Sequence, residues 1–341
     1  MKKFKLLIIA PSFLPKLGGV EKHLAEVLPI ITKRGYEVTM FVRFHKDIPK
    51  YQEYMGISVY RLPQEGPRSI WLKLWLNKNR RLWEDTDVVH SHDYYIPYLK
   101  KQLLCRWVHT FHGFESYPVQ ETARHSRQLV NQAVDYTFAV GKFIEKWYGT
   151  QCDEIIWGAS SMKAKKAAQK DYKFTFIFLG RLEPDTGILS YLKGFMELVK
   201  KDSSSNLLIV GDGSLHHEIQ QQISSHNLSD RVIMQGATKN PEKVFLQAKI
   251  ALVSGYLAII EAGRLQMPVV AVYENPLKKD YLKMHPAAAE LYIAGSVKQL
   301  AKVLRESLED KSGRAKKLQE WSKKQTWPHL ATRYIESYKE N

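Results

Sequence analysis

Residues 254–263 read Ser-Gly-Tyr-Leu-Ala-Ile-Ile-Glu-Ala-Gly, and they follow an apolar run at residues 250–253 that is typical of a buried strand. The small residues predict a turn into a helix that carries Glu261, and a second apolar run follows at residues 268–271. In an open parallel sheet such a turn lies at the carboxyl ends of the strands, where ligands bind. Helix-start amides accept phosphate and a carboxylate accepts hydroxyl hydrogens, so the stretch suits a ligand with both groups. The alternative is an ordinary strand, turn and helix with a surface glutamate.

Composition indicates a globular protein of about two domains, because the chain has 341 residues, of which 44% are hydrophobic and 25% charged. No apolar run reaches the roughly 18 residues that a membrane span needs. Lys5 and two prolines interrupt the apolar start, which we interpret as a buried strand and not a signal peptide. Two cysteines, Cys105 and Cys152, favour a reducing cytoplasm over a disulfide scaffold.

The chain is strongly basic, with a net charge of +16 and a pI near 9.5. Such an excess favours polyanions or an anionic membrane surface as partners. No zinc-finger, RNP or basic-zipper pattern is present, and the basic residues are spread along the whole chain, so we expect no nucleic-acid partner. A basic protein without a polyanionic partner is the alternative.

Short apolar runs alternate with helix-length segments twice along the chain, which implies parallel sheets. The expected strands lie at residues 6–10, 38–42, 87–90, 107–110 and 136–140, and then at 174–179, 206–210, 232–235, 250–253 and 269–272. Helices are expected at residues 20–34 and at 312–338, the latter broken near Trp327 and Pro328. We predict an α/β fold with two Rossmann-like domains, residues 1–158 and 174–311, that face a central cleft. A linker at 159–173 joins them, and C-terminal helices at 312–341 return toward the first domain.

Several motifs occur in one order along the chain. They are Pro-Ser-Phe-Leu-Pro-Lys-Leu-Gly-Gly-Val-Glu-Lys-His at 11–23, Arg-Gly-Tyr-Glu-Val-Thr at 34–39, Asp-Val-Val-His-Ser-His-Asp at 87–93, His-Thr-Phe-His-Gly at 109–113, Phe-Leu-Gly-Arg-Leu at 178–182, Val-Gly-Asp-Gly at 210–213 and the Glu261 stretch. With these motifs, nearly the whole chain resembles the retaining glycosyltransferases of family 4 (glycosyl transferases group 1), which have the GT-B fold. The resemblance implies transfer of a sugar from a nucleotide-diphosphate sugar to a hydroxyl of a glycan or lipid-linked acceptor, with retention at the anomeric carbon.

The resemblance also implies roles for individual residues. Arg181 would pair with the donor diphosphate and stabilise the leaving group, Glu261 would hold the ribose, and His112 would act near the donor sugar. The implied donor-binding set is Gly18, Gly19, Arg181, Gly211, Gly213, Ser254, Gly255, Tyr256 and Glu261, and the implied acceptor-side set is Glu21, His90 and His92. The resemblance places the first domain on the acceptor side and the second on the nucleotide-sugar side.

Two positions depart from the family pattern. The family commonly has a second glutamate seven residues before the Glu261 equivalent, and this chain has no acidic residue there. A lysine usually follows the Arg181 equivalent, and Thr186 stands in its place. Lys278 and Lys279 are candidates for the missing cation. We expect no metal and no cofactor, because Arg181 and helix N-termini supply positive charge and no Asp-x-Asp clamp is present.

A tryptophan-rich basic segment at residues 69–83 can form a helix with Trp71, Leu74, Trp75 and Leu82 on one face. Such a helix suits an anionic membrane interface or a lipid-linked acceptor, and the alternative is a face packed on the sheet. We therefore predict a cytoplasmic enzyme, peripheral on the inner face of the membrane and involved in cell-envelope polysaccharide synthesis. The alternatives are a GT-B nucleotide-sugar epimerase and a non-catalytic protein that binds nucleotide sugars or polyanions.

Overall fold

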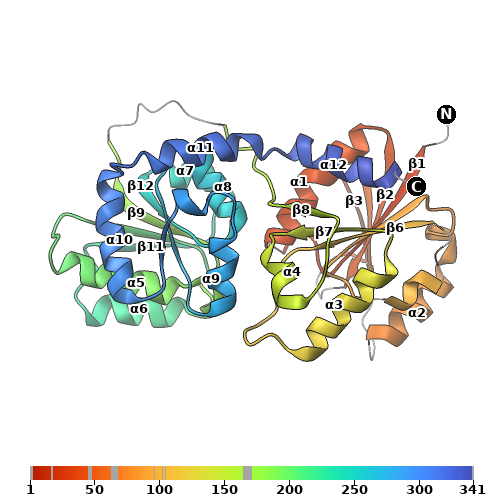
Figure 1. Ribbon diagram of the computed structural model, residues 1–341, viewed down its shortest axis with the longest axis horizontal. Helices are drawn as coiled ribbons and strands as arrows, with labels where there is room; N and C mark the ends of the chain where they lie inside the picture. Colours follow the sequence, from red (N-terminus) through yellow and green to blue (C-terminus); the bar gives the residue numbers. More distant parts are fainter. Residues whose placement is uncertain are drawn as a thin grey trace. The chain divides into compact units, whose positions relative to one another are not determined.

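The computed structural model describes residues 3–16, 18–44, 48–62, 68–95, 97–101, 103, 105–163 and 171–339, with backbone alone for 68–72, 98 and 99. The chain divides into two compact units, residues 1–158 with 327–341 and residues 159–326 (Figure 1). The predicted C-terminal segment is divided between them, since helix α11 (Arg314–Lys324) belongs to the second unit and α12 (Trp327–Lys339) to the first. Residues 164–170 of the predicted linker lie outside the described residues.

An eight-stranded sheet forms the centre of the first unit, in the order β3-β4-β2-β1-β5-β6-β7-β8. Its strands are β1 (Phe4–Ala10), β2 (Tyr36–Arg43), β3 (Tyr51–Tyr54), β4 (Ile57–Leu62), β5 (Val88–His92), β6 (Arg106–Phe111), β7 (Tyr136–Val140) and β8 (Glu154–Ile156). Besides α12, its helices are α1 (Gly19–Lys33), α2 (Arg68–Lys78), α3 (Glu121–Ala133), α4 (Phe143–Tyr148) and the 3-10 turns at Arg80–Leu82 and Pro97–Lys101. All strand pairs are parallel except β3 with β4.

A six-stranded parallel sheet forms the centre of the second unit, in the order β11-β10-β9-β12-β13-β14. Its strands are β9 (Phe174–Leu179), β10 (Leu207–Val210), β11 (Val232–Gln235), β12 (Ala248–Leu252), β13 (Val269–Val272) and β14 (Tyr292–Ala294). With α11, its helices are α5 (Ile188–Val199), α6 (His216–Ser225), α7 (Pro241–Phe245), α8 (Tyr256–Arg264), α9 (Pro276–Lys283), α10 (Val297–Glu309) and the 3-10 turns Pro184–Thr186 and Ala288–Glu290.

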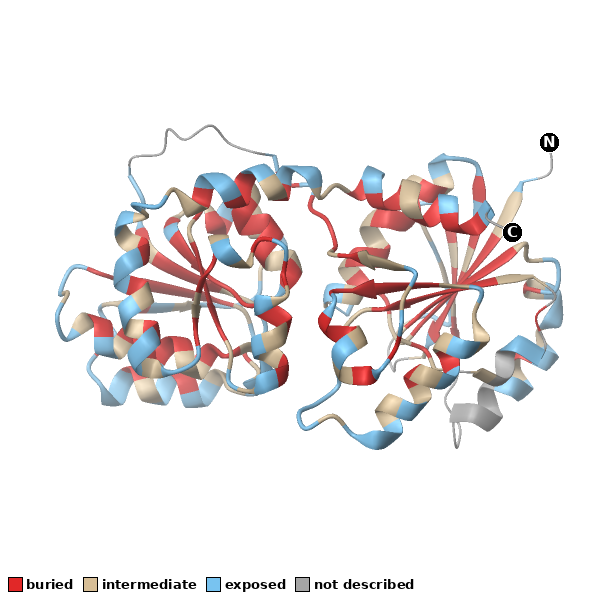
Figure 2. Ribbon diagram, viewed as in Figure 1, coloured by how far each residue is buried: buried red, intermediate tan, exposed pale blue. Residues whose placement is uncertain are grey.

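The strand predictions are confirmed to within two residues at each end. The central strands are buried along nearly their whole length because helices cover both sheet faces, so each reads as a continuous apolar run (Figure 2). The hairpin of β3 and β4 was not predicted from the sequence. Its turn uses Met55 and Gly56, both with positive φ, and Met-Gly is not among the usual turn dipeptides.

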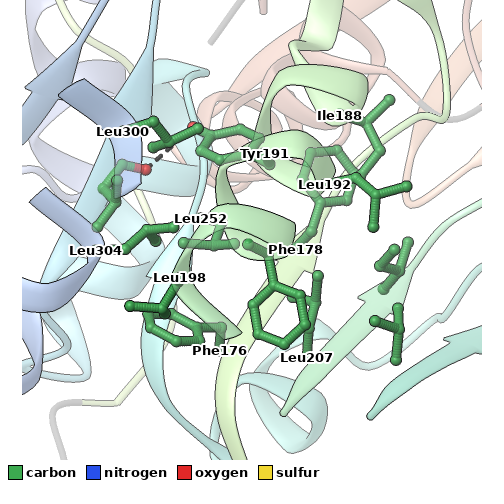
Figure 3. Packing of buried hydrophobic residues seen from close by; sticks show 14 of the residues in the cluster. Phe176, Phe178, Ile188, Tyr191, Leu192, Leu198, Leu207, Leu252, Leu300 and Leu304 are labelled. Carbon is green, nitrogen blue, oxygen red and sulfur yellow. Dashed lines mark hydrogen bonds between the residues drawn. The ribbon is translucent and has the colours of Figure 1, made fainter. Parts of the chain in front are cut away.

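One apolar cluster fills the space between the second sheet and helices α5 and α10. Figure 3 shows how helix residues pack over strand residues; the labelled side chains are Ile188, Tyr191, Leu192, Leu198, Leu300 and Leu304 from the helices and Phe176, Phe178, Leu207 and Leu252 from the strands. These side chains are at most 2% exposed, which fixes the sheet and the loops at its edge.

Part of the tryptophan-rich segment, in α2 and the 3-10 turn after it, packs on the first sheet. Trp75 packs on Phe41 of the sheet, with ring centroids 4.9 Å apart, and Leu82 joins the same cluster. Leu74, by contrast, is 64% exposed. Trp75 and Leu82 therefore belong to the core face, and the side chain of Trp71 lies outside the described residues.

Each sheet reverses its strand order at one point. In the first unit the chain passes from β1 to β2 and β4 on one side and then to β5 through β8 on the other. In the second unit the reversal lies between β9 and β12. Ligands bind outside the carboxyl ends of strands at such a switch point.

Candidate functional site

The switch point of the first unit brings together the start of α1 and the end of β5. Gly18 is the N-cap residue of α1, and Gly19 is its first helical residue. Glu21, two residues further on, is 5% exposed and accepts a hydrogen bond from the Ser12 hydroxyl, which follows β1. A Cβ at Gly18 would lie 2.3 Å from a carboxylate oxygen of Glu21, so this glycine makes room for Glu21.

His92 and His112 meet at the carboxyl ends of β5 and β6. Nδ1 of His92 lies 2.8 Å from Nε2 of His112, so one of these nitrogens donates to the other. Asp93 accepts hydrogen bonds from the His112 backbone amide at 2.9 Å and from the Tyr95 hydroxyl at 3.1 Å. Asp93 has a φ of 44°, a conformation that costs energy outside glycine and occurs often at functional sites. The hydrogen bond to Asp93 therefore fixes the backbone of His112, and the hydrogen bond with His92 fixes its ring.

The histidines of this edge are held neutral. Burial lowers the pKa of His92 and of His90 well below the ordinary value, and neighbouring histidines add to the effect. Burial and the positive charge of Arg127 lower the pKa of half-buried His112 to about 3. A neutral imidazole donates one hydrogen bond and accepts one, without adding charge to the site.

His90 lies deeper than a substrate-binding residue would. Its side chain is fully buried, with Nδ1 2.8 Å from the Tyr338 hydroxyl and Nε2 2.8 Å from Oγ1 of Thr110. Both ring nitrogens are thus bonded inside the first unit. His90 therefore has no ring nitrogen left to bond an acceptor, as the predicted acceptor-side role would need.

Arg181 follows β9 at the switch point of the second unit. Its side chain is 57% exposed and donates to Asp185 at 2.7 Å. Thr186, at the position of the family lysine, uses its hydroxyl to donate to the backbone oxygen of Glu183 at 2.7 Å. The loop after β9 therefore offers one accessible cation, and Thr186 adds none.

Gly211 and Gly213 follow β10 and lie against the loop after β9. A Cβ at Gly211 would lie 1.8 Å from the backbone oxygen of Gly180, and Gly211 has a φ of 150°. A Cβ at Gly213 would lie 2.5 Å from the backbone oxygen of Leu182. Close packing of two loops accounts for both glycines, and their role in donor binding stays a prediction.

The start of α8 is only partly open. The Tyr256 amide donates to the Tyr281 hydroxyl at 2.8 Å, and the two rings stack with centroids 3.9 Å apart. The Ser254 hydroxyl lies 2.6 Å from the Tyr191 hydroxyl and accepts from the Val272 amide at 3.0 Å. A Cβ at Gly255 would meet nothing within 4 Å. Of the three predicted residues, Gly255 has open space, while Ser254 and the Tyr256 amide are bonded within the fold.

Glu261 lies on α8 and is 5% exposed. Lys278 lies in the first turn of α9, after β13, and its Nζ is 4.1 Å from the ring centroid of Tyr281. Burial lowers the pKa of Lys278 to about 8; Asp185 and Glu274 raise it, and Arg181 lowers it. The charges of Arg181 and Lys278 therefore act on each other at the same sheet edge.

Two residues of these edges were not predicted from the sequence. Arg127 is 1% exposed, stacks 3.8 Å above the Tyr148 ring and donates to the backbone oxygen of Gly113 at 2.7 Å. Tyr281 caps α8 from a position 25 residues away. Neither has a local sequence signal, because each acts through a partner that is brought near only by folding.

Two features are absent from the part of the chain that the structure describes. No helix there is both long and apolar enough to cross a membrane. Within the same residues, no group of three or more histidine, cysteine, aspartate or glutamate side chains is arranged to hold a metal ion.

Two family models match the chain in succession. The model described as Glycosyltransferase Family 4 matches residues 17–162, and the model described as Glycosyl transferases group 1 matches residues 161–325. The chain belongs to the GT-B glycosyltransferases. The predicted recognition, a family 4-like protein, and the predicted fold class are thereby confirmed.

Sequence relatives of this glycosyltransferase are distant. An uncharacterised glycosyltransferase of Methanocaldococcus jannaschii is 34% identical over 104 residues, which are 29% of this chain and 25% of the relative. The alpha-monoglucosyldiacylglycerol synthase of Streptococcus pneumoniae is 20% identical over 79% of this chain and 71% of its own. The phosphatidylinositol N-acetylglucosaminyltransferase subunit GPI3 of Saccharomyces cerevisiae is 20% identical over 78% of this chain and 67% of its own.

Solved structures share the fold over nearly the full length. Anabaena HepE in complex with UDP has a TM-score of 0.77 at 16% identity and covers 97% of this chain and 98% of its own. WaaG, a glycosyltransferase involved in lipopolysaccharide biosynthesis, has a TM-score of 0.72 at 12% identity over 98% of this chain and 100% of its own. At these identities the likeness concerns the fold.

Proposed function

We propose that this glycosyltransferase moves a sugar from a nucleotide-diphosphate sugar to a hydroxyl acceptor, with retention at the anomeric carbon and without a metal ion. The observation that carries the proposal is the switch point of the second sheet, where Arg181, Lys278 and the start of α8, open at Gly255, lie at one edge. Two cations and a helix start there suit a diphosphate. UDP is the favoured nucleotide, because HepE was solved with it.

In the proposed complex Arg181 leaves Asp185 and pairs with the diphosphate. Lys278 supplies the second positive charge, which the family lysine at the position of Thr186 would otherwise provide. Both charges stabilise the departing nucleotide diphosphate as the glycosidic bond breaks. Glu261 accepts hydrogen bonds from the ribose hydroxyls. Gly255 permits close approach of the backbone to the donor, because nothing occupies the space beside its Cα.

In the first unit, His112 acts as a hydrogen-bond partner of the donor sugar. Its Nε2 is engaged with His92, and its Nδ1 has no partner among the described residues. Since its pKa is about 3, the ring stays neutral at physiological pH and works through hydrogen bonding. Gly18, Gly19, Glu21 and His92 surround the same switch point and complete the proposed donor-sugar and acceptor side.

The proposed acceptor is a glycan or a lipid-linked sugar. The names of two sequence relatives specify a glucosylated diacylglycerol and phosphatidylinositol, and WaaG, which shares the fold, is involved in lipopolysaccharide biosynthesis. The net charge of +16 favours an anionic membrane surface. We therefore place the enzyme in the cytoplasm, peripheral on the membrane, in cell-envelope polysaccharide synthesis and without a nucleic-acid partner.

The proposal is tested by incubating the protein with a panel of UDP-sugars and following release of UDP. Turnover with one donor, retained anomeric configuration in the product by proton NMR and unchanged rate with EDTA are expected. Glu261→Ala should weaken donor binding by about 1–3 kcal/mol in calorimetry, with Glu261→Gln as the conservative control. Epimerised donor without transfer, tight binding without turnover, or a product of inverted configuration would contradict the proposal.

A further inference from the structure

A buried chain of hydrogen bonds runs from the C-terminal helix to the start of α1. The Tyr338 hydroxyl lies 2.8 Å from Nδ1 of His90, and Nε2 of His90 lies 2.8 Å from Oγ1 of Thr110. Thr110 donates to the Tyr334 hydroxyl at 3.4 Å, the longest link, and that hydroxyl lies 2.8 Å from Nε2 of His23. Each of these five side chains is at most 3% exposed. This chain of hydrogen bonds joins α12, β5, β6 and α1 within the first unit.

One direction of these hydrogen bonds agrees with the hydrogen bond that Thr110 donates to Tyr334. If Tyr338 donates to His90, then His90 donates to Thr110, Thr110 donates to Tyr334 and Tyr334 donates to His23. In the opposite direction the Tyr338 hydroxyl hydrogen has no acceptor among the described residues. Since Tyr334 accepts from Thr110, its own hydroxyl hydrogen goes to Nε2 of His23, and the first direction holds.

The direction determines the tautomer of His23. Because Nε2 of His23 accepts from Tyr334, its hydrogen must be on Nδ1, and burial lowers the pKa of His23 so far that the ring is neutral. The His23 ring lies edge-to-face with His112, with centroids 4.8 Å apart, and has Trp327 of α12 on another side at 5.5 Å. His23 therefore connects the hydroxyls of α12 to the ring proposed to contact the donor sugar.

We propose that Tyr334 is a positioning residue of the enzyme, which fixes His23 in its Nδ1–H tautomer and through His23 holds the ring of His112. This inference deepens the proposed function and rests on it for its effect on turnover. The tautomer itself is a property of the first unit and is measured without any substrate. Failure of the proposed function and failure of the inference are thus separate results.

The test uses the full-length protein with nitrogen-15-labelled histidine, and long-range proton–nitrogen NMR distinguishes a protonated ring nitrogen from a bare one. At neutral pH His23 should show a protonated Nδ1 and a bare Nε2. His90 should show a bare Nδ1 and a protonated Nε2. In Tyr334→Phe the ring of the tyrosine remains, and the His23 signals should become a mixture of both tautomers. A protonated Nε2 of His23 in the unchanged protein would overturn the inference.

Tyr136→Phe is the matched control, because the Tyr136 hydroxyl makes a 3.4 Å contact with Glu154 outside the chain of hydrogen bonds. It should leave the His23 tautomer and the turnover unchanged. Tyr334→Phe should lower kcat by about 3- to 10-fold, with a smaller change in the donor KM, because the fold persists while His112 loses its fixed orientation. Equal kcat in the two variants, with both folded by circular dichroism, would overturn the positioning role even if the tautomer is as expected.

Discussion

Arg181 donates a hydrogen bond to Asp185 across 2.7 Å, and both side chains are more than half exposed, at 57% and 53%. An exposed ion pair of this kind contributes less than about 1 kcal/mol, so a diphosphate can displace the carboxylate at small cost. The pair therefore holds Arg181 at the switch point when no donor is bound.

Asp185→Asn should strengthen donor binding, because the carboxylate both competes for Arg181 and repels a diphosphate. A gain of about 2- to 5-fold in affinity is expected, in line with the small contribution of an exposed pair. Isothermal titration calorimetry with the donor measures it.

Arg181→Ala should lower kcat more than it raises the donor KM, since charge on the leaving diphosphate grows toward the transition state. Arg181→Lys is the control that keeps the charge without the planar fork. Full turnover of the alanine variant at saturating donor would remove Arg181 from the mechanism.

Donor affinity should depend on pH through Lys278. Its pKa of about 8 means that the amine is charged below that pH and neutral above it. A diphosphate binds the charged form, so affinity should be constant below about pH 7.5 and fall up to tenfold per pH unit above about pH 8.5. Calorimetry with a nucleotide sugar between about pH 6.5 and 9.5 gives the curve.

Lys278→Arg should abolish this pH dependence while retaining affinity, because an arginine stays charged throughout the range. Lys278→Met should bind weakly at every pH. A wild-type curve that coincides with the arginine curve would show that Lys278 does not contact the donor.

Gly211→Ala should prevent the second unit from folding or cost more than about 4 kcal/mol, because its Cβ would overlap the Gly180 carbonyl. Gly255→Ala is the contrasting change, since its Cβ meets nothing within 4 Å and its φ is −98°. It should retain the melting temperature and weaken donor binding, as measured by thermal unfolding with and without donor. A stable Gly211→Ala protein would contradict the close packing of the two loops.

The protein should sediment with anionic liposomes at low salt and be released as salt rises, since the Debye length is about 8 Å at physiological ionic strength. Lys73→Glu with Leu74→Glu should weaken this binding and leave the fold intact, because both side chains are exposed. Trp75 is unsuitable for this test, since it packs on Phe41.

Ile233→Glu is the control for the membrane test, as Ile233 is 45% exposed in the second unit. It should not change liposome binding. Equal binding to neutral and anionic vesicles, or tighter salt-sensitive binding to duplex DNA, would exclude the membrane interpretation.

Local patterns in the sequence were sufficient for the two parallel sheets. Residues 136–140, 174–179, 232–235 and 269–272 were predicted as strands with the bounds that the structure has. In the central strands burial on both faces makes a continuous apolar run, which is readable without knowledge of the neighbouring strands. The motifs were read in the same way, and their order identified the fold and placed Arg181 and His112 at strand ends.

Tertiary structure alone decided which polar atoms meet. His23 bonds to Tyr334, 311 positions away, and His90 bonds to Tyr338, 248 positions away, because α12 packs in the first unit. The same holds for the Tyr256 amide, which donates to the Tyr281 hydroxyl, and for Gly211, where the Gly180 carbonyl leaves no room for a Cβ. Strand formation depends on the polarity of neighbouring residues along the chain, and the sequence by itself determined it. Hydrogen-bond partners and close contacts depend on how distant segments pack, and only the folded chain determines them.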